Sequence, residues 1–155
     1  MSAVIKQAEL NFRYMQEQDL DKVAQIEARA YEFPWSRAIF RDCLRVGYGC
    51  WVLESDAMIV GYGMMSVAVG ESHILNLCVD PPLQGQGLGH TLLHFLLDVA
   101  RQNKANCIFL EVRSSNDKAK LMYARNGFVE AGMRHDYYPA AAGREDAVIM
   151  AMSLV

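Results

Sequence analysis

The residues best suited to bind a small ligand form a glycine-rich loop, QGQGLG, at residues 84 to 89. An apolar stretch that ends at Val79 leads into this loop, and an amphipathic stretch with helical spacing starts at Leu88. A strand, a glycine loop and a helix N-terminus in this order direct backbone N–H groups and the positive end of the helix dipole to one place. Glycines lack a Cβ, so a phosphate can approach the backbone closely. The loop therefore predicts a site for a phosphorylated ligand.

The spacing of the glycines decides which phosphorylated ligand fits. A dinucleotide fingerprint that began at Gly85 and Gly87 would need a glycine at position 90, where the chain has His90. A Walker A loop would need a Gly-Lys pair followed by Ser or Thr, which the loop lacks. The pattern disfavours NAD and ATP as ligands. A tight turn whose glycines only permit the geometry remains the structural alternative.

Two side chains have the chemistry to move protons. Glu111 lies in FLEVR, a predicted strand covered on both faces, where loss of solvent would raise the pKa of the carboxyl group. Tyr123 lies two helical turns after Asn116, so both side chains share nearly one face of a predicted helix. The residues alone leave alternatives open. Glu111 could be a strand-end residue in solvent or paired with Arg113, and Tyr123 could be a core aromatic near Phe128.

The elements that must position these groups follow from hydrophobic spacing and from capping residues. Asp19 is predicted to open the first helix and Pro34 to end it. Ser36 is predicted to cap the second helix. Asn116 is predicted to cap the last helix, and Gly127 to end it. In the first half of the chain we expect a strand at 10 to 16, helices at 20 to 30 and 37 to 46, and a hairpin at 48 to 69 that turns at 55 to 57. A strand at 73 to 79, a helix that includes 88 to 99 and a strand at 107 to 112 should follow. The chain should end with a helix through 126 and an antiparallel pair at 128 to 133 and 145 to 154.

The order of these elements predicts the fold class. A strand, a long helix and a second strand in succession imply two parallel neighbours joined by a right-handed crossover, whereas the hairpins imply antiparallel pairs. We therefore expect a mixed α/β fold: a mostly antiparallel central sheet with one parallel strand-helix-strand crossover and flanking helices. Residues 1–155 are expected to form a single domain, because the length suits one core.

Composition narrows the classes of partner. The net charge of −3 offers no broad attraction to nucleic acid or to anionic lipid, so neither nucleic-acid nor membrane binding is expected. No apolar run is long enough to span a membrane and the start lacks signal-peptide features, which predicts a cytoplasmic location. The cysteines form no CxxC pair and are expected to be small buried hydrophobes; they are Cys43, Cys50, Cys78 and Cys107.

The loop also carries a family resemblance. Gln84, Gly87 and Gly89 match [Q/R]xxGx[G/A], the loop that holds the coenzyme A pyrophosphate in the GNAT superfamily of N-acetyltransferases. Nearly the whole chain resembles the bacterial members that acetylate the N-terminal alanine of the eighteenth small-subunit ribosomal protein. The segments that carry this resemblance are ILNLCVDPPLQGQGLG, LEVRSSNDKAKLMYARNGF, FPWS and YYP. Gln84 stands where many N-terminal acetyltransferases have arginine, and both residues are allowed at this position of the superfamily pattern.

The resemblance implies a GNAT fold, acetyl-CoA as the acetyl donor and direct attack by an amine without a covalent acetyl-enzyme. It implies that Glu111 is the general base, often through water, and that Tyr123 protonates the departing thiolate. The residues that it implies for the cofactor are Leu77, Cys78, Val79, Gln84, Gly85, Gln86, Gly87, Leu88, Gly89 and Asn116. Leu77 or Cys78 would offer a backbone N–H to the oxyanion, and Val79 would act through its backbone.

The acceptor site and the metal content complete the expectations. Phe33, Trp35, Tyr137 and Tyr138 fall in predicted loops, where by analogy they would bind the acceptor, although they could also seal the edge of the core. No metal is expected, because the two helical histidines at 90 and 94 have no evident third ligand. Acetylation of another amine, on a lysine, an antibiotic or a polyamine, and a non-catalytic acyl-CoA or partner-binding module are the functional alternatives.

Overall fold

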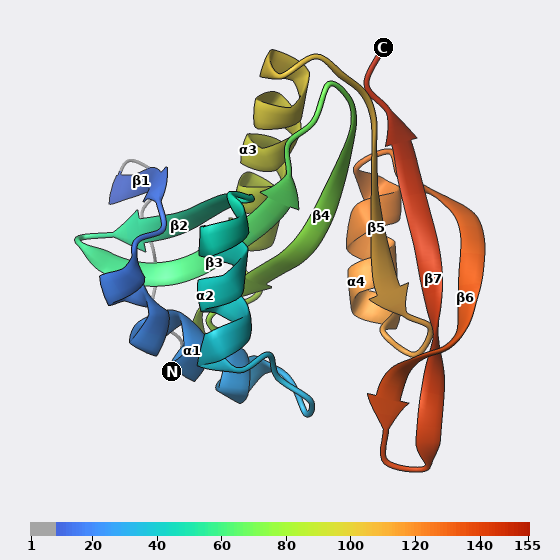
Figure 1. Cartoon of the computed structure of the whole chain (residues 1–155), viewed down its shortest axis with the longest axis horizontal. Helices are drawn as coiled ribbons and strands as arrows, with labels where there is room; N and C mark the ends of the chain where they lie inside the picture. The colour runs from blue at the N-terminus through green and yellow to red at the C-terminus, as the bar shows by residue number, and fades with distance from the viewer. Residues whose placement is uncertain (1–8) are drawn as a thin grey trace. The chain divides into compact units, whose positions relative to one another are not determined.

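The computed structural model describes residues 9–155, which group into two compact units (Figure 1). The first unit contains the chain up to Ser66 together with Asn76–Asp98, and the second contains Val67–Leu75 together with Val99–Val155. Strand β4 (Gly70–Val79) and helix α3 (Leu88–Gln102) each contribute residues to both units. The chain therefore passes between the units through regular secondary structure.

The first unit is built on an antiparallel meander. It contains β1 (Leu10–Tyr14), the 3₁₀ helix η2 (Glu17–Asp19), α1 (Leu20–Ala30), α2 (Arg37–Val46), β2 (Gly49–Ser55), β3 (Met58–Ser66), the end of β4, the 3₁₀ helix η3 (Pro81–Leu83) and most of α3. Strands β1, β2 and β3 pair antiparallel in chain order. Asp56 and Ala57 turn the β2–β3 hairpin with positive φ, at the predicted position.

The helix boundaries of this unit follow local signals. Ser36 accepts a hydrogen bond from the Ile39 N–H at 3.3 Å and caps α2, as its sequence predicts. Gly47, with φ of 89°, ends α2 in the left-handed conformation that favours glycine. Helix α1 ends at Ala30, so Pro34 lies in the following loop and does not itself terminate the helix.

Apolar side chains of α3 pack on the meander. Phe95 stacks on Phe12 of β1 with ring centroids 4.0 Å apart, and it meets Trp51 of β2 edge-on at 5.5 Å. Leu53 and Leu92 are completely buried in the adjoining cluster. These contacts bury the apolar stripe of α3 that its sequence spacing predicts.

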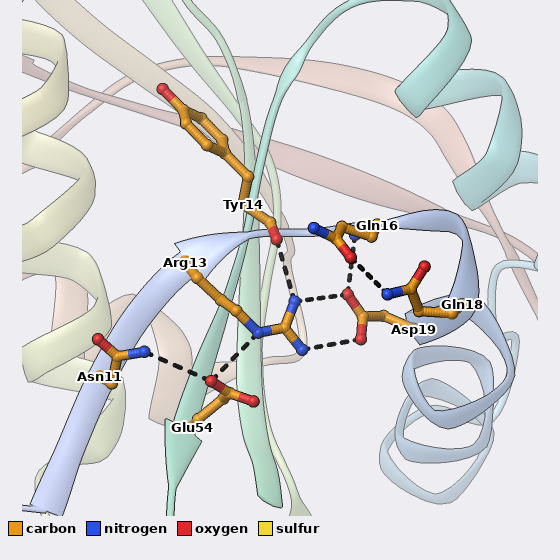
Figure 2. Close-up of polar contacts among 7 residues, drawn as sticks. All are labelled: Asn11, Arg13, Tyr14, Gln16, Gln18, Asp19 and Glu54. Carbon is orange, nitrogen blue, oxygen red and sulfur yellow. Dashed lines mark hydrogen bonds and ion pairs between the residues drawn. The ribbon is translucent and has the colours of Figure 1, made fainter. Parts of the chain in front are cut away.

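An ion-pair cluster fastens the start of this unit (Figure 2). Arg13 of β1 forms a fork with the Asp19 carboxylate, with N···O distances of 2.8 and 2.9 Å, and also pairs with Glu54 of β2 at 3.1 Å. Asp19 additionally accepts a hydrogen bond from the backbone N–H of Gln16 at 2.8 Å. One guanidinium thus joins β1, β2 and the turn that precedes α1.

The second unit contains the start of β4, the end of α3, β5 (Ala105–Arg113), α4 (Asp117–Arg125), β6 (Val129–Ala140) and β7 (Gly143–Ser153). Gly70–Ile74 of β4 run parallel to β5, whereas β5 pairs with β7 and β7 with β6 antiparallel. Within residues 9–155, the seven hydrogen-bonded strands follow the order β1-β2-β3-β4-β5-β7-β6. The predicted fold class is confirmed: a mostly antiparallel sheet has one parallel pair and flanking helices.

The last hairpin is longer than its sequence predicts. Strand β6 continues to Ala140, so the expectation that Tyr137 and Tyr138 lie in a loop is wrong. The strand bulges between Arg134 and Tyr138. These two residues are four positions apart on β6, whereas their partners on β7, Ala147 and Glu145, are only two positions apart. Asp136 takes φ of 53° there. The bulge absorbs the extra residues and lets pairing resume, which an alternating sequence pattern does not reveal.

Candidate functional site

The glycine loop of the first unit has a backbone open to a ligand. Gly85 and Gly87 both have φ of 83°, and a Cβ added to either would meet nothing within 4 Å. The Gln84 side chain donates to the Val79 carbonyl at 3.0 Å, which ties the loop to the end of β4. The Thr91 N–H donates to the Gly87 carbonyl at 3.0 Å, so the first turn of α3 starts from the loop itself. This open backbone at a helix N-terminus fits a pyrophosphate.

The end of β4 is held tightly. A Cβ on Gly61 of β3 would lie 2.8 Å from the Cys78 carbonyl oxygen, so only glycine permits this close approach. The Tyr31 hydroxyl donates to the Leu77 carbonyl at 3.2 Å. Burial raises the pKa of the Cys78 thiol to about 11, which leaves it a poor nucleophile at neutral pH. Contacts from β3 and from neighbouring side chains thus fix the backbone of Leu77, Cys78 and Val79.

A buried glutamate organises the loop between α1 and α2. Glu27 is 2% exposed and accepts hydrogen bonds from the Tyr62 hydroxyl at 2.6 Å, the Asn76 amide at 2.9 Å and the Trp35 backbone N–H at 3.0 Å. These donors come from β3, β4 and the loop. Phe33 and Trp35, the predicted acceptor residues, are half-buried in this loop, and the Trp35 ring packs against Phe40 at 5.4 Å.

In the second unit, Glu111 lies in a charged group that we call the Glu111 cluster: His73, Glu111, Arg134 and Tyr138. The Glu111 side chain is 7% exposed. His73 Nε2 is hydrogen-bonded to Glu111 Oε2, and Arg134 Nε contacts Oε1 at 3.2 Å. Burial is the main cause that raises the pKa of the Tyr138 hydroxyl, and the negative charge of Glu111 raises it further. The cluster thus draws on β4, β5 and β6.

The pKa of Glu111 shifts opposite to the direction predicted from sequence. Burial by itself raises this pKa, as expected, but the hydrogen bond and charge of His73, with those of Arg134, outweigh it and hold the pKa below its ordinary value. The expectation of a raised pKa is therefore wrong, because it considered only desolvation. Arg113, the partner that the sequence suggested as an alternative, pairs with Glu145 at 3.2 Å instead.

The two tyrosines on β6 line the same region. Their rings meet edge-on with centroids 4.9 Å apart. The Arg113 guanidinium lies over the Tyr138 ring at 4.6 Å, and that of Arg134 lies over the Tyr137 ring at 5.8 Å. Tyr138 is half-buried and Tyr137 is 45% exposed. The bulge in β6 brings these neighbouring aromatic rings beside the two cations.

Helix α4 holds the last two predicted residues. The Asn116 side chain accepts from the Ala119 N–H at 3.1 Å, which confirms that it caps α4. Tyr123 is buried, and its ring meets Phe128 at 5.5 Å, so the packing contact considered from sequence is present. Hydrogen bonds lower the pKa of the Glu145 carboxyl group to about 2. Those from Ser115 have the largest effect, and one from Arg113 adds to it. This carboxylate fixes the loop that leads into α4.

Sequence reasoning missed three residues of these arrangements: Glu27, His73 and Arg134. Glu27 carried a signal, because a carboxylate at a position seven residues after Leu20 falls on the apolar stripe of its helix. His73 and Arg134 carried none, because they meet Glu111 across strand pairs that are distant in the chain. His90 and His94 are exposed on α3, and their ring centroids lie 4.2 Å apart.

Within residues 9–155, no group of three or more potential ligands among His, Cys, Asp and Glu is placed to hold a metal ion. Among the helices of these residues, none has the length and apolar character needed to cross a bilayer. Cys43, Cys50 and Cys78 are buried as predicted, whereas Cys107 is partly exposed.

Comparison with known proteins supports one family. Residues 19–128 match the model of the Acetyltransferase (GNAT) family. The [ribosomal protein bS18]-alanine N-acetyltransferase of Escherichia coli strain K12 is 38% identical over 136 residues, which cover 88% of this chain and 92% of that protein. The protein of the same name from Haemophilus influenzae is 32% identical and covers 88% of this chain and 93% of its own length.

Solved structures agree with this result. The crystal structure of the E. coli ribosomal-protein-S18-alanine N-acetyltransferase has a TM-score of 0.87 and 36% identity, with 94% of each chain covered. A Salmonella typhimurium protein solved with acetyl-CoA shares the fold, with a TM-score of 0.76 and 19% identity, and 95% of each chain is covered. The family match over most of the chain and the close relatives lead to one conclusion: the chain belongs to the GNAT family of acetyltransferases.

Proposed function

We propose that this acetyltransferase transfers acetyl from acetyl-CoA to the N-terminal alanine of ribosomal protein bS18, the activity of the RimI enzymes. The observation that carries the proposal is the 38% identity to the E. coli bS18-alanine N-acetyltransferase over 88% of the chain. Because the acceptor is a ribosomal protein, the proposal places the chain in the cytoplasm. It also treats the two units as parts of one catalytic domain, since the family match from residue 19 to 128 includes segments of both.

The proposal assigns the glycine loop to the donor. The backbone N–H groups between Gln84 and Gly89 and the N-terminus of α3 would hold the pyrophosphate, because their positive ends face an anion. The backbone of Leu77–Val79 would hold the pantetheine arm, and an N–H of Leu77 or Cys78 would donate to the oxyanion. Asn116 would contribute a further polar contact. The open Cβ positions at Gly85 and Gly87 support this assignment.

Glu111 and Tyr123 would handle the protons. An α-ammonium has a pKa of about 8, so most of the acceptor must lose a proton before its nitrogen can attack the thioester. The Glu111 carboxylate would take that proton through water and pass it to solvent. The free amine would add to the thioester carbonyl to form the C–N bond and a tetrahedral oxyanion. The C–S bond would break as this oxyanion collapses and the nitrogen loses its second proton to water, while the Tyr123 hydroxyl would protonate the departing thiolate and regain a proton from solvent. The lowered pKa of Glu111 supports its part, because the carboxylate stays ionised at neutral pH.

Aromatic side chains would select the acceptor. Phe33 and Trp35, held in their loop by Glu27, and Tyr137 and Tyr138 on β6 would contact the first residues of the peptide. Their large rings bury much area at low cost in side-chain entropy. This function fits the segments FPWS and YYP, which contain these residues.

The test is acetyl transfer to a peptide that copies the N-terminus of bS18. Three peptides are compared: the free α-amine, the same peptide with its α-amine blocked, and a blocked peptide with an added internal lysine. Product is located by tandem mass spectrometry, and free thiol is measured in parallel. The Glu111→Gln variant serves as the enzyme control. Transfer to only the free α-amine is the expected result.

The other outcomes separate the alternatives. Transfer to the internal lysine would replace the proposal with a lysine acetyltransferase. Acetyl-CoA binding without thiol release with any peptide would contradict the proposed acceptor, and a screen of small amines and lysine peptides would then distinguish another substrate from a non-catalytic acyl-CoA-binding module.

A further inference from the structure

The carboxylate of Glu111 is held at both oxygens by nitrogen groups. Oε2 meets His73 Nε2 and Oε1 meets Arg134 Nε. An ionised carboxylate only accepts hydrogen bonds, so His73 Nε2 must carry the hydrogen of this contact. The arginine always carries its own. Each carboxylate oxygen keeps a second lone pair, so the group can still accept a proton from water.

We propose that His73 is a positioning residue for the acetyl-transfer reaction, which orients the Glu111 carboxylate for its part as the base. The inference rests on the proposed role of Glu111 in catalysis. It adds a residue that is not part of the glycine loop or of the aromatic acceptor segments.

The two donors to Glu111 are not equivalent. The His73 side chain is 24% exposed, and its ring stacks on Phe109 of β5 with centroids 4.2 Å apart and an interplanar angle of 13°. His73 and Phe109 are also backbone partners in the parallel pair of β4 and β5. The Arg134 side chain is 50% exposed and precedes the bulge of β6. Solvent screens the arginine more strongly, so His73 is the more effective of the two partners.

The charged and titratable groups around the pair come from three strands. Arg134 and Tyr138 of β6 face Glu111, and Arg113 of β5 lies over Tyr138, where its charge is balanced by Glu145 of β7. Arg134 is therefore a cation that acts directly on the Glu111 carboxylate beside His73. Removal of His73 would leave a buried carboxylate with one half-exposed cation, and burial would then raise its pKa.

The experiment compares two substitutions at His73 with one at a matched histidine. His73→Leu keeps an apolar side chain against Phe109 but removes the donor, whereas His73→Gln keeps an N–H donor without the imidazole ring. His135→Gln is the control, because His135 also meets a carboxylate, that of Asp146 at 3.5 Å, but is 79% exposed. For each variant, kcat and both KM values are measured from pH 6 to 9, with melting temperature and acetyl-CoA affinity as checks on folding.

We expect His73→Leu to lower kcat by roughly tenfold at pH 7, because a misplaced catalytic group loses rate without loss of binding. The acid limb of its pH profile should move to higher pH, since the base then protonates more easily. His73→Gln should restore most of kcat, and His135→Gln should match the wild type. A kcat for His73→Leu within twofold of the wild type at every pH would overturn the proposal. Equal losses in both His73 variants would also overturn it.

A second measurement needs no acceptor. With ¹³C-labelled glutamate, the Glu111 carboxyl resonance is assigned by its loss in Glu111→Gln and is titrated in the wild type and in His73→Leu. A higher Glu111 pKa in His73→Leu supports the role of His73 even if the ribosomal peptide proves to be the wrong acceptor. An unchanged titration would refute it while leaving the proposed function intact.

Discussion

At the scale of the residue, the pKa of Glu111 depends on a balance between burial and two neighbouring side chains that donate hydrogen bonds to the carboxylate. Burial favours the protonated carboxyl group, whereas His73 and Arg134 favour the carboxylate, and the neighbours prevail. The carboxylate is then available as a base at neutral pH. The carboxylate is a weak base. It therefore suits proton transfer through water from an α-ammonium whose pKa is about 8, because part of that amine is already unprotonated near this pH.

We predict that Glu111→Gln lowers kcat roughly 100-fold at pH 7, because a neutral amide cannot take the proton of the ammonium. The loss should shrink toward pH 9, where most of the α-amine is already unprotonated. Steady-state rates with the bS18 peptide at both pH values measure this. The exposed Glu130→Gln is the matched control and should behave like the wild type. A loss that stays constant from pH 7 to 9 would argue against the role of base.

At the scale of the element, polar side chains fix the segments that carry the site. Arg13 joins β1 and β2 to the turn before α1, Glu27 joins α1 to the loop with Trp35, and Glu145 joins β7 to the start of α4 (Figure 2 shows the first). The carboxylates of Asp19, Glu27 and Glu145 each accept a hydrogen bond from at least one backbone N–H. This bond fixes their orientation in a way that a side-chain ion pair alone would not.

Asp19→Asn should reduce the free energy of unfolding by about 2 kcal/mol at pH 7, because the charged fork with Arg13 is lost. Arg13 first, and the Gln16 N–H, lower the pKa of Asp19 in the folded state. The carboxylate therefore stabilises the fold above its unfolded pKa of about 4, and this contribution disappears as the pH falls further.

Urea unfolding of wild type and Asp19→Asn at pH 7 and at pH 3.5 tests this prediction. The difference between them should be smaller at the lower pH. Asp21→Asn is the control, because the Asp21 side chain, which pairs with Arg37, is 78% exposed and its loss should cost less than about 1 kcal/mol. A pH-independent difference for Asp19→Asn would contradict the assigned cause.

For the glycine loop, we predict that Gly87→Val weakens acetyl-CoA binding at least about tenfold, through lost backbone contacts to phosphate and a side chain in the approach path. Gly143→Val is the matched control. Gly143 also has positive φ and no atom within 4 Å of an added Cβ, but it lies in the β6–β7 hairpin. Both variants should lose about 1 to 2 kcal/mol of stability from backbone strain. Calorimetric titration should show weak acetyl-CoA binding in Gly87→Val alone, and equal affinities in the two variants would remove the loop from the donor site.

At the scale of the whole molecule, the two compact units share β4 and α3. Neither shared element is a linker, because β4 is a continuous strand and α3 is a continuous helix. Unfolding of one unit would therefore remove half of a strand and part of a helix that the other unit uses.

We predict that urea unfolds the chain in one cooperative transition, as expected of a single domain. The two tryptophans, Trp35 and Trp51, both belong to the first unit, so their fluorescence reports on that unit alone. Far-UV circular dichroism reports on both. The two midpoints should coincide. Separate midpoints would show that the units unfold independently and that the single-domain expectation is wrong.

The amino-acid sequence by itself determined the features that depend on near neighbours in the chain. The caps at Ser36 and Asn116 follow from short-range spacing, and so does the glycine loop before α3. The fold class also followed, because the order of elements restricts how strands can pair. The family resemblance pointed to Glu111 as the candidate base through the motif around it, which is again a local pattern.

Only the tertiary structure decided what surrounds Glu111. His73 is 38 positions away in the chain and Arg134 is 23, and both reach the carboxylate because strand pairing sets which side chains face one another. The bulge that keeps Tyr138 in β6 depends on its partner strand in the same way. The direction of the pKa shift was therefore not readable from FLEVR: desolvation can be inferred from an apolar strand, but the opposing charges come from elsewhere in the chain.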